Sequence, residues 1–158
     1  MPGVVCQHSL RLLHISNIGG RVMIKNKMLD DEVNAIKQSE FYKLLLKYID
    51  EKTGITFEII LKRVRKEYIV KVRQAAHYLL FSHVLSYSAV GRVFQRDHAT
   101  IKNSVEIIEN LLKTNYNHDI NQSIKKLIRE FEIYNDLHKS IRFEDTPEYK
   151  NRPNLPNQ

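Results

Sequence analysis

The stretch Arg96-Asp97-His98-Ala99-Thr100 places a guanidinium, a carboxylate, an imidazole and a hydroxyl at the start of an amphipathic run. Such groups can serve catalysis, metal binding or hydrogen bonding to a partner. Asp97 and His98 are adjacent, so on a helix their side chains diverge by about 100° and cannot form a base and its orienting acid. No serine or cysteine lies three or four residues from either of them. We therefore predict no catalytic residue and no enzyme.

Metal ligands with a suitable spacing are also missing from the sequence. His77 and His83 are six residues apart, His98 is isolated, and Cys6 is the single cysteine, so no zinc pattern is matched. The pattern GxxxxGK[ST] of nucleotide hydrolases does not occur. We expect no metal and no cofactor, and we interpret His77, His83 and His138 as surface or boundary residues of helices.

Two interpretations of the stretch remain open on the residues alone. In the first, Asp97 is an ordinary N-cap, favourable toward the helix dipole, and Thr100 completes the local hydrogen bonds. In the second, the stretch belongs to a helix-turn-helix, which needs a short helix, a tight turn and a second helix whose first residues face the DNA major groove. Residues 88–94, 95–96 and 97–112 fit these three parts.

The DNA interpretation also explains why the neighbours of Asp97 are polar or small. On such a second helix, Asp97 accepts a hydrogen bond from a cytosine amino group, His98 bonds to a base edge, and Ala99 contacts a thymine methyl group. Lys102 and Asn103 lie one turn further along, at positions suited to phosphate contacts.

The composition favours a polyanionic partner. The 158-residue chain carries a formal net charge of +7, with a pI near 9.5. Residues 62–73 hold six cations and one anion. Arg63 and Arg65 would point in different directions on a helix, whereas both can reach a DNA backbone from a loop. Two alternatives stay open for this basic run: a solvated helix face, or a surface that binds an acidic protein.

The remainder of the chain predicts an all-α fold. Residues 39–140 are expected to form one domain, between a poorly ordered N-terminal segment at 1–38 and a disordered tail at 141–158. Apolar residues at spacings of three and four predict five or six helices within the domain. The candidates are 40–53, 57–61, about 70–84, 88–94, 97–112 and 120–137, with Ser39, Thr56, Ser88 and Asp119 as N-caps and Gly54 as a C-cap.

The sequence also predicts a cytoplasmic protein without membrane contact. A single cysteine suits a reducing compartment. No run of 18 apolar residues occurs, and the first residues lack the layout of a secretory signal.

The segment VGRVFQRDHATIKNSVEIIENL resembles the C-terminal DNA-binding domain of the DnaA family of bacterial replication initiators, whose typical motif runs IGxxFGGRDHTTVxHAxxKIE. The upstream basic run and VRQAAHYLL are similar to that family's basic loop and its R-Q-x-A-x-x-L helix. The similarity covers about residues 40–135. It implies a Trp-repressor-like helix-turn-helix bundle that binds double-stranded DNA.

The resemblance also implies roles for the residues that match the family's motifs. In that family an arginine of the basic loop enters the minor groove, and Arg65 matches it; an Arg-Gln pair holds backbone phosphate, and Arg73 and Gln74 match that pair. The residues expected to contact bases are Arg65, Asp97, His98, Ala99 and Thr100. Those expected to contact phosphates are Lys62, Arg63, Lys71, Arg73, Gln74, Ser88, Arg96, Lys102 and Asn103.

Several positions depart from the family pattern. Ala99 replaces a threonine, Val72 a proline, and Asn103 a histidine that is common there, while Gln95 replaces the Gly-Gly before the arginine. The first helix begins with YSA, where the family favours Leu-Pro-Glu. These departures bear on which DNA sequence is recognised.

The resemblance implies work in replication initiation or its regulation, with a replication initiator or another replication protein as a candidate second partner. Initiators of this family also contain an ATPase domain, so we expect a lone DNA-binding domain here. A transcriptional repressor of a phage or mobile element, and an adaptor that binds an acidic protein through the basic run, remain alternatives. The residues do not predict an oligomeric state.

Overall fold

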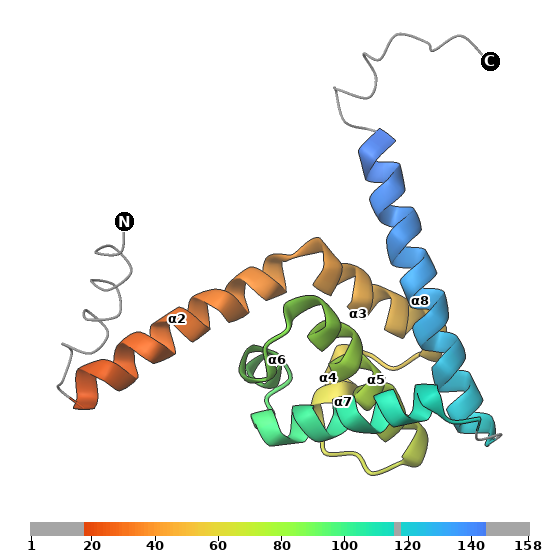
Figure 1. The fold of residues 1–158 in the computed structure, drawn as a ribbon, viewed down its shortest axis with the longest axis horizontal. Helices are drawn as coiled ribbons and strands as arrows, with labels where there is room; N and C mark the ends of the chain where they lie inside the picture. Colours follow the sequence, from red (N-terminus) through yellow and green to blue (C-terminus); the bar gives the residue numbers. More distant parts are fainter. Residues whose placement is uncertain (1–17, 116–117, 145–158) are drawn as a thin grey trace, which may run out of the picture.

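The computed structural model describes residues 18–115 and 118–144, and these residues form seven helices and no strand (Figure 1). The all-α prediction is therefore confirmed, with one helix more than the five or six expected. The helices are α2 (Ile18–Gln38), α3 (Glu40–Thr53), α4 (Phe57–Leu61), α5 (Glu67–Val84), α6 (Tyr87–Val93), α7 (His98–Lys113) and α8 (Asp119–Glu144).

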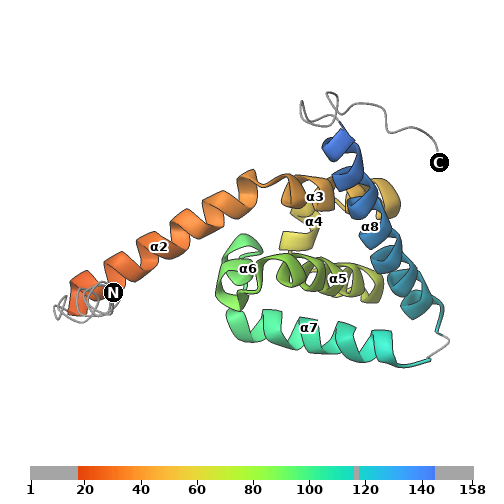
Figure 2. The same cartoon turned by 45° about the horizontal axis from the view of Figure 1, so that its top comes forward.

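Helix α5 is the centre of the bundle. Its contacts with α3, α4, α6, α7 and α8 surround it, and Figures 1 and 2 both show it in the middle of the molecule. This position follows from its sequence, because neighbouring residues on more than one face are apolar or small. The fully buried ones are Val72, Ala75, Ala76 and Leu80. Helices α7 and α8 pack on α5 through Ile101, Val105, Ile108, Ile124 and Ile128.

The extra helix is α2, and it corrects the prediction that residues 1–38 are poorly ordered. Val33 and Ile36, three positions apart, are buried where α2 packs on α6 and α3. Asp30 also forms a 2.6 Å ion pair with Arg92 of α6. The helix therefore contacts residues about 60 positions away in the chain. Residues 1–17 of the predicted segment lie outside the described residues.

The ends of α3 and α8 compare differently with the prediction. Ser39 caps α3 by accepting a hydrogen bond from the Tyr42 N–H, and Gly54 ends it in the left-handed region at φ +68°, as expected. Asp119 is the first residue of α8 rather than its cap. Because α8 continues to Glu144, it also includes the first residues of the predicted tail, and residues 145–158 lie outside the described part of the chain.

Helix α5 begins earlier than expected, at Glu67 instead of about Val70. The basic run is therefore divided between two elements. Residues 62–66, called the basic loop from here on, connect α4 to α5 without helical structure, while Lys71 and Arg73 lie on α5.

The described helices include none that is long and apolar enough to cross a membrane.

Candidate nucleic-acid interface

Helices α6 and α7 form the helix-turn-helix, joined by the turn at residues 94–97. Ser86 caps α6, because its hydroxyl accepts the Ala89 N–H at 3.3 Å. Ser88, which was expected to be the cap, lies within α6 as an exposed side chain. The predicted N-cap was therefore wrong by two residues, since Ser86 has the extended backbone that a cap requires.

The turn is held by a close approach of two backbone segments. The Arg96 N–H donates to the Gly91 carbonyl oxygen at 2.7 Å. A Cβ atom at position 91 would lie only 2.6 Å from the Arg96 carbonyl oxygen, so glycine is required there on steric grounds. Gln95 supplies the change of direction by adopting the left-handed region at φ 54°, which is unfavourable for a residue with a side chain.

Asp97 is the N-cap of α7, as the first interpretation of the sequence stated. Its Oδ1 accepts the Thr100 N–H at 2.6 Å, and this backbone hydrogen bond lowers the pKa of the carboxyl group. The Thr100 side chain also interacts with this carboxylate and lowers the pKa further. Asp97 is exposed together with His98, Ala99 and Thr100, so the first turn of α7 presents all four to solvent. Capping and base recognition are compatible in this geometry.

On its buried side, α7 is fastened to α5 through a histidine. His77 is 1% exposed, and its Nδ1 lies 3.0 Å from the Ser104 hydroxyl oxygen, which in turn donates to the Thr100 carbonyl at 2.9 Å. Because the single Ser104 proton goes to Thr100, His77 donates from Nδ1. Burial, followed by the charges of Arg73 and Arg96, lowers the pKa of His77 to about 3, so the ring is neutral.

This contact corrects the interpretation of His77 as a surface or boundary residue. The ring packs edge-on against Phe94, with centroids 4.6 Å apart, beneath the turn of the helix-turn-helix. Its neighbours in the sequence, Ala75, Ala76 and Leu79, are all buried and were the available signal. These buried neighbours indicated that His77 faces the core, whereas its polar residue type suggested the surface.

The basic loop lies beside the turn and exposes Lys62, Arg63, Arg65 and Lys66. Its backbone is held by Arg73 of α5, which donates from Nε to the Ile60 carbonyl at 2.7 Å and from Nη2 to the Lys62 carbonyl at 2.6 Å. The sequence predicted a phosphate contact for Arg73; in the structure its side chain is partly buried and donates hydrogen bonds to carbonyl oxygens.

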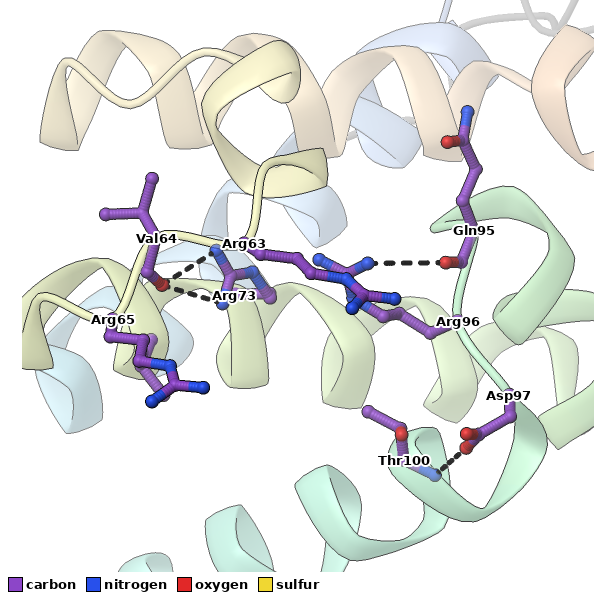
Figure 3. A pocket seen from close by; sticks show the side chains of 9 residues that line it. Arg63, Val64, Arg65, Arg73, Gln95, Arg96, Asp97 and Thr100 are labelled. Carbon is purple, nitrogen blue, oxygen red and sulfur yellow. Dashed lines mark hydrogen bonds between the residues drawn. The ribbon is translucent and has the colours of Figure 1, made fainter.

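The basic loop, α5 and the helix-turn-helix together line an open hollow of about 400 Å³. Figure 3 shows Arg63 from the loop and Arg96 from the turn extending toward its middle, with Asp97 and Thr100 at its α7 edge. Four arginines line the hollow against one carboxylate, so it favours an anion. The residues that line it are Arg63, Val64, Arg65, Val70, Arg73, Gln95, Arg96, Asp97 and Thr100.

This surface matches a known family. Residues 42–108 fit the family model described as bacterial DnaA protein helix-turn-helix. These residues are similar to the DnaA helix-turn-helix family.

A curated relative supports the assignment. The chromosomal replication initiator protein DnaA 1 of Chlamydia pneumoniae is 34% identical over 100 residues, which cover 63% of this chain. The chain spans only about a fifth of the length of that relative, 21%. No solved structure matches the chain significantly.

The DnaA-like interface brings together six of the residues predicted from the sequence: Arg63, Arg65, Arg73, Arg96, Asp97 and Thr100 all line the hollow. His98 and Ala99 extend the same exposed turn of α7, and Lys102 and Asn103 are exposed one turn further along. Lys102 is 4.0 Å from Glu106 in an exposed i,i+4 pair, which is weak enough to be exchanged for a phosphate.

The other predicted contacts lie outside the hollow. Lys71 is partly buried at the start of α5, and Ser88 is exposed on α6. Gln74 is partly buried, and its Oε1 has no hydrogen-bond partner among the described residues. Val64, Val70 and Gln95 line the hollow without having been predicted. The described residues contain no cluster of three or more histidine, cysteine or acidic side chains able to hold a metal ion.

Proposed function

We propose that the chain binds double-stranded DNA in a sequence-specific manner, and that it serves replication initiation or its regulation. One observation carries the proposal: the exposed first turn of α7 adjoins a hollow lined by four arginines. The turn offers hydrogen-bonding groups to base edges, while the hollow offers charge to the backbone. Protein–DNA recognition requires both, because phosphate contacts position the protein and base contacts give sequence specificity.

Each part of the surface has a proposed role. Helix α7 acts as the recognition helix in the major groove, where Asp97, His98, Ala99 and Thr100 contact bases. Arg65 of the basic loop enters the neighbouring minor groove. The proposed phosphate contacts are Lys62, Arg63, Lys71, Gln74, Ser88, Lys102 and Asn103.

A replication initiator or another replication protein is the proposed second partner, since the curated relative is named a chromosomal replication initiator. A cytoplasmic location belongs to the same proposal.

The first test is selection of bound duplexes from a random pool, followed by titration of the preferred duplex at several salt concentrations. Contact with four to six phosphates gives a slope of log K against log salt of roughly −4 to −5. A charge control is Lys47→Gln, because Lys47 is exposed on α3, outside the hollow, and forms an ion pair with Glu51. This variant should retain the slope of the parent.

Two results would contradict the proposal. Enrichment of no sequence would remove sequence specificity, and a slope near zero would remove the phosphate contacts. Tighter binding to an acidic protein surface than to duplex DNA would favour an adaptor instead.

A further inference from the structure

Two arginines outside the basic loop converge on the backbone at its start. Arg73, on α5, bonds to the carbonyl oxygens of Ile60 and Lys62 at 2.7 and 2.6 Å. Arg96, in the turn of the helix-turn-helix, donates from Nη2 to the Leu61 carbonyl at 2.9 Å. Three successive carbonyl groups are therefore held by guanidinium groups from two different elements.

These carbonyls need partners because they end a helix. The last carbonyl groups of α4 have no intrahelical donors, and cations are favourable at a helix C-terminus. Helix α4 has five residues, which is too short to be stable without tertiary contacts. Arg73 also donates to the Val64 carbonyl at 3.3 Å, so its bonds extend into the middle of the loop.

The arrangement is specific to arginine. Burial, and then the charge of Arg96, lower the pKa of Arg73. A planar guanidinium donates from three nitrogens in a fixed fork and can reach several separated carbonyls at once, whereas the three donors of a lysine ammonium radiate from one nitrogen.

We propose that Arg73 and Arg96 are positioning residues that hold the basic loop in fixed register with α7. Arg65 on the loop and His98 on α7 then meet DNA as one preformed surface. Because the loop is already ordered in the free protein, binding does not include the entropy cost of ordering it. The inference rests on the proposed function, and it gives Arg73 and Arg96 a role through the loop in addition to the positive charge that they bring to the hollow.

The first test needs no DNA. Backbone ¹⁵N relaxation of residues 62–66 is measured in the parent, in Arg73→Lys and in the control Lys71→Gln. Lys71 also lies on α5, but its side chain forms no hydrogen bond or ion pair with the loop within the described part of the chain. The loop order parameters of the parent and of the control should be about 0.85, while those of Arg73→Lys should fall below about 0.6. Unchanged order parameters in Arg73→Lys would overturn the inference. If Arg73→Lys does not fold, Arg96→Lys gives the same test through the Leu61 carbonyl.

The second test is a double-mutant cycle on the preferred duplex. Arg65→Ala should weaken binding about tenfold in the parent but less than about twofold in the Arg73→Lys background, because the loop is already displaced there. In a control cycle, the effects of Arg65→Ala and Lys102→Gln should multiply within about twofold, since Lys102 lies on α7 and does not line the hollow that Arg65 lines.

Independent multiplication of Arg65→Ala and Arg73→Lys would overturn the positioning role and favour direct contact of Arg73 with phosphate. Absence of any preferred duplex for the parent would instead overturn the proposed function. The relaxation measurement would still decide whether Arg73 holds the loop.

Discussion

Replacing Gly91 by alanine tests the geometry of the helix-turn-helix most severely. The added Cβ would lie 2.6 Å from the Arg96 carbonyl oxygen, and this oxygen belongs to the backbone, so no side-chain rotation relieves the contact. An ordinary C···O contact is about 3.3 Å or longer, which requires the turn to move by about 0.7 Å. The same movement strains the 2.7 Å hydrogen bond from the Arg96 N–H to the Gly91 carbonyl.

The expected cost combines two effects. Overpacking contributes about 1–3 kcal/mol, and the weakened hydrogen bond about 1 kcal/mol, so Gly91→Ala should lower the free energy of unfolding by about 2–4 kcal/mol. The assay is urea denaturation at equilibrium, with duplex binding measured on the protein that remains folded. Because the clash displaces the backbone of Arg96 and of the following Asp97, DNA affinity should fall as well.

Gly54→Ala is the matched control. Gly54 has φ +68° but open space around its Cβ position, so alanine there adds only backbone strain of about 1–2 kcal/mol and leaves DNA binding unchanged. A free energy of unfolding for Gly91→Ala equal to that of the parent, or a smaller loss than in Gly54→Ala, would refute the steric reasoning.

Three further substitutions test the turn, the buried histidine and the end of α7. Gln95→Gly should raise the free energy of unfolding by about 0.5–1 kcal/mol in urea denaturation, because glycine adopts φ 54° without strain; a loss of stability would contradict this. The pKa of His77 is lowered from 6.5 to about 3, so its contribution to stability is complete above pH 6.5 and is lost as the pH falls toward 3. Between pH 6 and 4 the unfolding free energy of the parent should therefore fall more steeply than that of His77→Gln, by up to about 1.4 kcal/mol per pH unit; equal slopes would show that His77 titrates normally. Lys125 is 6% exposed and donates to the Thr114 carbonyl at the end of α7. Lys125→Met should lower the free energy of unfolding by about 1–3 kcal/mol, whereas the same substitution at the exposed neighbour, Lys126→Met, should have little effect. Equal effects of the two substitutions would contradict the contact.

Local sequence signals predicted the parts of the fold that depend on local physics. Ser39 and Gly54 mark the ends of α3 because a hydroxyl N-cap and a left-handed C-cap act within one turn of the helix. The apolar spacing of Ile101, Val105 and Ile108 identifies the buried face of α7 in the same way. The exposed first turn of α7 follows from its N-cap, Asp97, together with this apolar spacing.

The remaining features depend on contacts between distant segments. Helix α2 is stabilised by packing on α6 and by the pair of Asp30 with Arg92, which the polar sequence of residues 18–38 does not reveal. Arg73 is a cation in a basic run, and only the folded chain places the Ile60 and Lys62 carbonyls within its reach. Such long-range hydrogen bonds have no sequence period, so spacing arguments miss them.

The central claim is that the first turn of α7 reads bases. The most direct measurement is the ratio of affinities for the preferred duplex and for a duplex changed at one base pair, in the parent, Asp97→Asn and His98→Ala. Asparagine caps a helix nearly as well as aspartate, so Asp97→Asn should keep its melting temperature.

The parent should favour the preferred duplex by about tenfold or more, and the ratio should fall toward one at one base pair in each variant. An unchanged ratio in both variants, with the fold intact, would contradict base recognition by α7.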